Sequence, residues 1–174
     1  MCLSVVKLAG YQIPKEFESG RRKRSRLIGY KILRKMPEHV FGKNVLYPPY
    51  LSTTSAGLKT KEWNVDSSNY HLEAHGNGRQ YPSGYHIFDS MEDALSEEIV
   101  GTNECEVYKI QYRDVVAIGE EYGIIIVSEE MENVAIKKVI VAKQIKIIEK
   151  VEKRGKSRSK NNQKTVNTVE DTDG

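Results

Sequence analysis

The stretch Gly84-Tyr85-His86-Ile87-Phe88-Asp89-Ser90-Met91-Glu92-Asp93-Ala94-Leu95 decides the fold class of this 174-residue chain. Its first five residues are rich in aromatic and β-branched types and predict a β-strand. Ser90 then offers a helix cap, and Asp93 stands at the capping-box position three residues on. An apolar stripe at helical spacing follows, made up of Met91, Ala94, Leu95 and Ile99. The stretch therefore predicts a strand, a cap and a principal helix at about 90–100.

Strand patterns lie on both sides of this unit. Upstream, Arg26–Leu33 predicts a strand that Pro37 ends. Downstream, a turn is expected at Gly119–Gly123, and the predicted strands are 106–112, 115–118, 124–127, 135–142 and 145–148. Turn-sized connections favour antiparallel pairing. We therefore expect an α+β fold, with a mainly antiparallel twisted sheet of about six to eight short strands and one principal helix.

The composition changes sharply near the end of the chain. From Val151 onward almost all residues are charged or polar, and only Val166 and Val169 are apolar. Such a segment cannot bury enough surface to offset the entropy lost on ordering. We expect one domain at 1–150 and a charged, disordered tail at 151–174.

The cellular location is predicted from the absence of targeting and membrane-spanning patterns. The N-terminus has no signal-peptide pattern, and the apolar run Ile124–Val127 falls far short of the ~20 residues that span a bilayer. Two cysteines, Cys2 and Cys105, are too few for a disulfide framework. These features predict a cytoplasmic protein without membrane association.

Aromatic residues with polar groups concentrate in the loop-rich segment 41–81 and just beyond it. Ten Tyr outnumber three Phe and one Trp. Such side chains suit protein interfaces and base stacking, although they also fasten long loops to a sheet. The predicted binding residues are Tyr47, Tyr50, Trp63, Tyr70, Arg79, Tyr81, Tyr85 and His86.

Basic clusters suggest nucleic-acid binding as an alternative. The net charge is +3, but cations gather at Lys153–Lys160 and in the cluster Arg21, Arg22, Lys23, Arg24 and Arg26. Clusters of this kind attract phosphate backbones. Short cationic runs also occur as solvated loops or beside apolar strands, so both interpretations stay open.

No metal, cofactor or catalytic residue is predicted. His71, Glu73 and His75 alternate and would share one face of a strand, and His39 or His86 could add a fourth zinc ligand. A loop with exposed histidines explains the same pattern. Cys105 stands between two glutamates, which raise a thiol pKa and argue against a nucleophile.

An enzymatic alternative comes from a second pattern. Tyr50–Ser55 loosely resembles the Ser-Thr-Ser strand of ADP-ribosyltransferases, in which an earlier Arg and a later Glu-x-Glu element complete the nicotinamide-nucleotide site. The resemblance implies that Arg34, Ser52 and Glu121 converge on one pocket. Glu120-Glu121 lacks the Glu-x-Glu spacing, which puts that implication in doubt.

A broader resemblance covers residues 27–148. The matching stretches are Gly29–Leu33, Leu46–Tyr50, Trp63, Tyr81–Phe88, Met91–Ala94 and a Val-rich stretch at 134–148. Together they resemble a set of small phage and bacterial accessory proteins. The resemblance implies an accessory protein of a mobile element and no particular activity. We expect a non-enzymatic binding protein that inhibits or modulates a host defence macromolecule, or sequesters a nucleotide. The expected partner is a host protein or a nucleotide.

Overall fold

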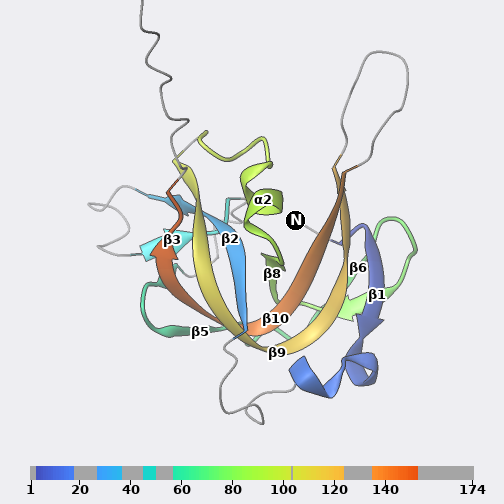
Figure 1. The fold of residues 1–174 in the computed structure, drawn as a ribbon. Helices are drawn as coiled ribbons and strands as arrows, with labels where there is room; N and C mark the ends of the chain where they lie inside the picture. The colour runs from blue at the N-terminus through green and yellow to red at the C-terminus, as the bar shows by residue number, and fades with distance from the viewer. Residues whose placement is uncertain are drawn as a thin grey trace, which may run out of the picture.

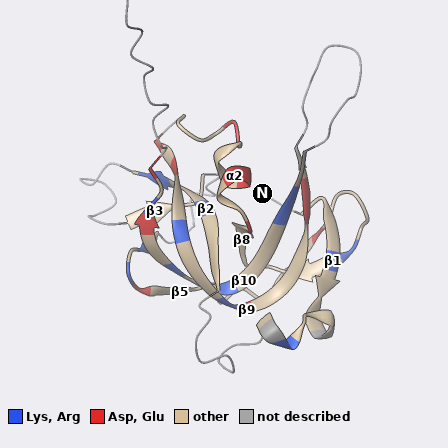
Figure 2. Cartoon of the chain, viewed as in Figure 1, with Lys and Arg blue, Asp and Glu red and all other residues tan. Residues whose placement is uncertain are grey.

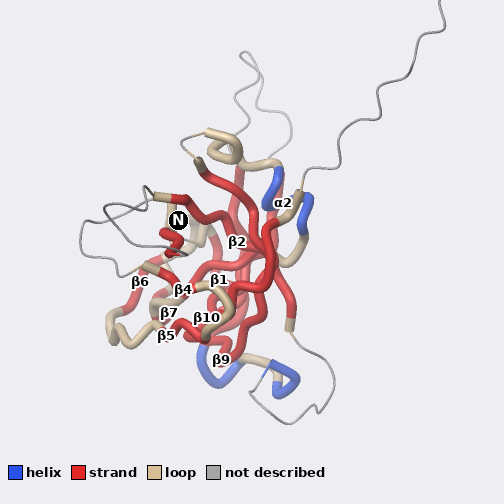
Figure 3. Tube along the Cα trace, turned by 90° about the vertical axis from the view of Figure 1, so that its left-hand side faces the viewer, coloured by secondary structure: helices blue, strands red, loops and turns tan. Residues whose placement is uncertain are grey.

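Strands dominate the computed structural model, which describes residues 3–17, 27–36, 45–49, 57–102, 104–123 and 135–152 (Figure 3). The strands are β1 (Val5–Ala9), β2 (Ile28–Lys35), β3 (Val45–Tyr47), β4 (Leu58–Lys59), β5 (Trp63–Val65), β6 (His71–Glu73), β7 (Gln80–Pro82), β8 (Tyr85–Phe88), β9 (Cys105–Gly123) and β10 (Ala135–Lys150). The helical elements are the 3-10 turns η1 (Gly10–Gln12) and η2 (Lys15–Phe17) and the α-helix α2 (Met91–Leu95).

Eight of these strands form one sheet, and β6 and β7 form a separate pair. The large sheet has the order β1-β9-β10-β8-β2-β3-β4, and β5 pairs with β10 outside this path. Because β2 also pairs with β9, the strands β9, β10, β8 and β2 close into a ring. All pairings between these strands are antiparallel. The predicted mainly antiparallel sheet is thus confirmed, and the described residues contain a single, short α-helix.

The two longest strands form the frame of the sheet. β9 has 19 residues and β10 has 16, and both curve around α2 (Figure 1). The predicted turn at Gly119–Gly123 is wrong, because these residues lie inside β9 and pair with β1 or β10. The register of β9 with β10 shifts between Val115 and Ala117, close to Asp114, whose φ is 57°. A bulge of this kind bends a strand without ending it, so the expectation of short strands fails here.

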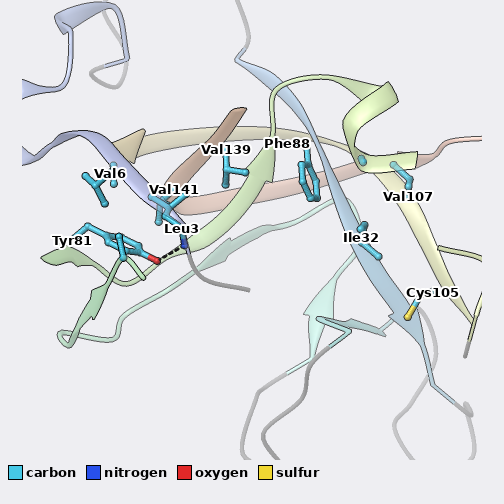
Figure 4. Packing of buried hydrophobic residues seen from close by; sticks show 12 residues of the cluster. Leu3, Val6, Ile32, Tyr81, Phe88, Cys105, Val107, Val139 and Val141 are labelled. Atoms are coloured by element: carbon cyan, nitrogen blue, oxygen red, sulfur yellow. Dashed lines mark hydrogen bonds between the residues drawn. The ribbon is translucent and has the colours of Figure 1, made fainter. Parts of the chain in front are cut away.

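The core has two layers because β10 buries both of its faces between Val139 and Ala142. Val139 and Val141 pack with Phe88 and α2 in the first layer (Figure 4), while Ile140 and Ala142 face the second. The second layer is built from Leu33, Leu46, Leu58, Ile87, Tyr108, Ile110, Tyr112, Ile140, Ala142, Ile145 and Ile147. Alternate residues of one strand thus serve opposite layers.

The helix begins as the sequence predicts but ends early. The Asp93 N–H donates to Ser90 Oγ over 3.0 Å, which confirms the cap. Ser96 ends the helix, and its hydroxyl donates to the Asp93 carbonyl over 2.8 Å. A serine hydroxyl that bonds the preceding turn competes with continuation of the helix. The predicted helix at 90–100 is therefore one short helix followed by turns.

Ser90→Ala is expected to lower the free energy of unfolding by about 1 kcal/mol, because the Asp93 N–H loses its acceptor. Urea denaturation measures the change. Ser96→Ala is the matched control, since its hydroxyl bonds a carbonyl at the solvent-exposed helix end. Equal losses in the two variants would contradict the capping role.

The described chain continues slightly past β10. The Val151 N–H donates to the Val107 carbonyl over 2.8 Å, and residues 153–174 of the expected tail lie outside the described residues. In the described ranges, no helix is long and apolar enough to cross a membrane.

Candidate functional site

The predicted binding residues do not form one surface. Tyr47, Tyr81 and His86 are buried, so they cannot offer the exposed contact that the sequence suggests. Trp63 and Tyr70 are exposed. Tyr50 lies outside the described residues, as do Ser52 and the cationic cluster Arg21, Arg22, Lys23, Arg24 and Arg26.

Tyr81 and His86 form a hydrogen-bonded chain in the core. The Leu3 N–H donates to the Tyr81 hydroxyl over 2.9 Å (Figure 4), and this hydroxyl lies 3.1 Å from Nε2 of His86. Burial, aided by the charge of Lys31, lowers the pKa of His86 to about 3. One nitrogen of a neutral imidazole donates a hydrogen bond and the other accepts one, so the ring and the hydroxyl satisfy each other's buried polar groups.

Lys31 is a buried cation beside Tyr85. Its Nζ donates to the His86 carbonyl over 2.9 Å and lies 5.9 Å from the centre of the Tyr85 ring. Burial lowers the pKa of Lys31 to about 8. Burial, with a smaller contribution from the Asp66 charge, raises the pKa of half-buried Tyr85 to about 12. Tyr85 thus lies at the edge of the core, packed against its second layer.

Arg79 covers the free edge of β1. Its Nη1 donates to the Lys7 carbonyl over 3.2 Å, and its Nη2 donates to Oε1 of Gln12 over 2.9 Å. Asn77 Nδ2 donates to the Val6 carbonyl over 3.1 Å. Unpaired edge carbonyls invite pairing with other chains, so Arg79 has a structural task at this edge.

Arg34, on β2, lies beside the first residue of β9, whereas Glu121 lies near the other end of β9. Arg34 is the register partner of Cys105, whereas Glu121 is the register partner of Lys137. Each has a buried atom without a hydrogen-bond partner, Nε of Arg34 and Oε2 of Glu121. The pocket near Cys105 is lined by neither residue. The described residues therefore show no common pocket for them.

Glu121 belongs to a small charged cluster near the turn after α2. Lys137 is buried and its Nζ pairs with Glu97. Burial, and then the Glu97 carboxylate, raise the pKa of Glu121 to about 7, while the amino terminus and Lys137 act in the opposite direction. Glu97 thus forms the ion pair with Lys137, whereas Glu121 lies near both charges without an ion pair among the described residues.

A pocket of about 410 Å³ opens between the turn after α2 and the adjoining ends of β9 and β10. Its lining residues are Leu95, Val100, Gly101, Cys105, Glu106, Val107, Lys150, Val151 and Glu152. Cys105 is buried, and burial raises the pKa of its thiol. Lys150 pairs with Glu106 at the rim. These features disfavour a reactive thiolate.

The histidines considered as zinc ligands do not form a metal site among the described residues. His71 and Glu73 lie exposed on β6, and His75 is exposed in the following turn. Within the part of the chain that the structure describes, no three His, Cys, Asp or Glu side chains gather closely enough to hold a metal ion.

The most distinctive surface is the outward face of β5, β10 and β9, which we call the Trp63 face. It consists of Trp63, Val65, Gln111, Arg113, Gln144 and Lys146. Register places Trp63, Lys146 and Gln111 in one row across the three strands. Val65, Gln144 and Arg113 form the next row. Cross-strand partners project to the same side of a sheet, so the six side chains share one face.

Arg113 and Trp63 meet across this face. The guanidinium carbon lies 4.2 Å from the centre of the indole ring, although Trp63 is still 38% exposed. The Arg113 Nε donates to Oε1 of Gln144 over 2.7 Å, and the Gln144 amide donates to Asp114. Figure 2 shows further cationic positions along β9 and β10. Arg113 is therefore held in place from two sides.

Sequence reasoning found Trp63 but missed its neighbours. Gln111, Arg113, Gln144 and Lys146 alternate with buried Tyr112 and Ile145, which is the ordinary pattern of a half-buried strand. Nothing local distinguishes them from other solvent-facing positions. Their importance depends on the pairing of three strands that are far apart in the chain.

No protein-family model, curated protein or solved structure matches the chain.

Proposed function

We propose that this chain is a non-enzymatic binding protein that occupies a partner macromolecule with the Trp63 face. The observation that carries the proposal is the exposed indole stacked by Arg113 at 4.2 Å on a three-stranded surface. Trp and Arg are the residue types most enriched at energetic centres of interfaces.

Rigidity supports this proposal. Arg113 bonds Gln144, and Gln144 bonds Asp114, so the guanidinium needs little ordering when a partner arrives. Immobilising a long free side chain on binding costs about 0.5–1.5 kcal/mol. A cation and an aromatic ring that are already fixed on strands avoid much of that loss.

The position of β5 does not require the Trp63 side chain, so a purely structural role does not account for this residue. β5 pairs with β10 at three positions. The Asn64 side chain also fixes the preceding turn, since its Oδ1 accepts from the Lys59 N–H over 2.8 Å and its Nδ2 donates to the Lys59 carbonyl over 2.9 Å. β5 is thus anchored without the indole, which is left partly open to solvent.

The resemblance to phage and bacterial accessory proteins supports a biological setting for this binding. We propose that the partner is a host macromolecule and that binding modulates a defence function. The transferase alternative is disfavoured by the separation of Arg34 from Glu121 along β9.

Capture from a bacterial lysate tests the proposal. We expect Trp63→Ala and Arg113→Gln to reduce the retained partner at least about tenfold, as for interface centres. Tyr122→Ala is the matched control, because Tyr122 is also 38% exposed and lies outside the Trp63 face. Equal capture by all three variants and the unaltered protein would contradict the proposal.

A further inference from the structure

We infer that the partner of the Trp63 face is single-stranded nucleic acid. This inference rests on the proposed function and names the chemical class of its partner. Three properties of the face carry it: an accessible aromatic ring, cations beside that ring, and amide side chains between them. These are the groups that bind unpaired bases and their phosphates together.

The aromatic contribution comes from Trp63. Its indole is stacked by Arg113 but stays 38% exposed. Every base has a π-face, so stacking on an indole tolerates sequence changes, and a guanidinium adds a cation–π contribution. The bases of an intact duplex are stacked on each other and cannot reach a sheet surface in this way. An unpaired strand can offer them.

The charge on this face suits a polyanion. Arg113 bonds neutral Gln144, and Lys146 forms no ion pair with any carboxylate among the described residues. Lys109 adds a third cation at the edge, where it lies 3.4 Å from Glu149. The nearby Asp114 carboxylate accepts from Gln144. Two cations are thus available to phosphates.

The remaining positions favour a nucleic acid over a protein. Gln111 and Gln144 can both donate and accept hydrogen bonds, which suits base edges. Lysine is depleted at protein interfaces, whereas Lys146 lies between Trp63 and Gln111 in one row of this face. A face with one aromatic ring, two cations and two amides therefore matches an unpaired strand better.

The test uses the chain's single tryptophan as a reporter. Oligothymidylate and oligouridylate of about twelve nucleotides are titrated into the full chain, and blunt duplex DNA is the control. We expect the Trp63 emission to be quenched by the single strands, with the duplex at least about tenfold weaker. With two phosphates neutralised, the log–log salt slope should be about −1.4.

Variants locate the binding, with labelled oligonucleotide anisotropy as the readout. Trp63→Ala should weaken binding at least about tenfold, and Lys146→Gln should weaken it and make the salt slope shallower. Arg113→Lys keeps the charge but loses the planar stack, so it should fall between the unaltered protein and Arg113→Gln. Lys138→Gln, outside this face and paired with Asp89 at 2.9 Å, is the matched control.

Two results would overturn the inference. One is oligonucleotide binding that disappears when Arg21, Arg22, Lys23, Arg24 and Arg26 are replaced by glutamine but survives Trp63→Ala. The other is no binding at all. If a lysate protein is nevertheless retained in a Trp63-dependent way, the inference fails while the proposed binding function stands. If nothing is retained, both fail.

Discussion

Replacing Tyr81 with phenylalanine will lower the free energy of unfolding by about 2–3 kcal/mol, because two buried groups lose their partner. The Leu3 N–H donates to the Tyr81 hydroxyl, and His86 Nε2 lies 3.1 Å from it. Phenylalanine fills the same space, so the loss reports hydrogen bonding and not a cavity. Urea unfolding of the two proteins measures it.

Tyr70→Phe is the control for this loss, since Tyr70 is 60% exposed and water can replace its partners. We expect its effect to stay within about 0.5 kcal/mol. Oligonucleotide affinity of folded Tyr81→Phe should match that of the unaltered protein. A stable variant with impaired binding would show that Tyr81 belongs to the contact surface after all.

Glu121→Gln will stabilise the protein by about 2 kcal/mol at pH 8 and leave it nearly unchanged at pH 4, after allowance for solvent near the carboxyl. Burial and Glu97 raise the pKa of Glu121 from 4.5 to about 7 in the folded state. The unaltered protein therefore loses stability as the pH rises from about 4.5 to about 7, and loses no more above that range.

Glu120→Gln is the control, because the Glu120 carboxylate is next to Glu121 in the sequence and pairs with Lys7 at 3.2 Å in a partly exposed ion pair. Such pairs contribute at most about 1 kcal/mol, so the difference from the unaltered protein should not grow at alkaline pH. Thermal unfolding at several pH values distinguishes the two variants. Destabilisation by Glu121→Gln at pH 8 would refute the raised pKa.

Local signals predicted part of the fold. Ser90 caps α2 because its hydroxyl accepts from a residue three positions away, a contact that the sequence itself specifies. The continuity of β9 was not predictable in this way. Gly119 normally indicates a turn, yet here a Cβ would lie 2.2 Å from the Val5 carbonyl. The close approach of β1 requires this glycine, and that requirement exists only in the folded sheet.

The candidate site was less predictable because it also depends on contacts that exist only in the folded protein. Tyrosine and histidine occur both at interfaces and in buried hydrogen-bonded chains. The sequence alone therefore could not show which of these two environments holds Tyr81 and His86. The Trp63 face joins Trp63 with Arg113 and Lys146 through strand register. Register is a property of tertiary pairing, and it brings together residues that no linear motif connects.

Acrylamide quenching of the single tryptophan tests the central claim most directly, because it does not depend on which partner binds. Emission is measured for the free chain and for the chain saturated with the species that it retains from lysate. Trp63, 38% exposed when free, should be readily quenched alone and shielded in the complex. Equal quenching of the free and the saturated chain would show that the partner binds elsewhere.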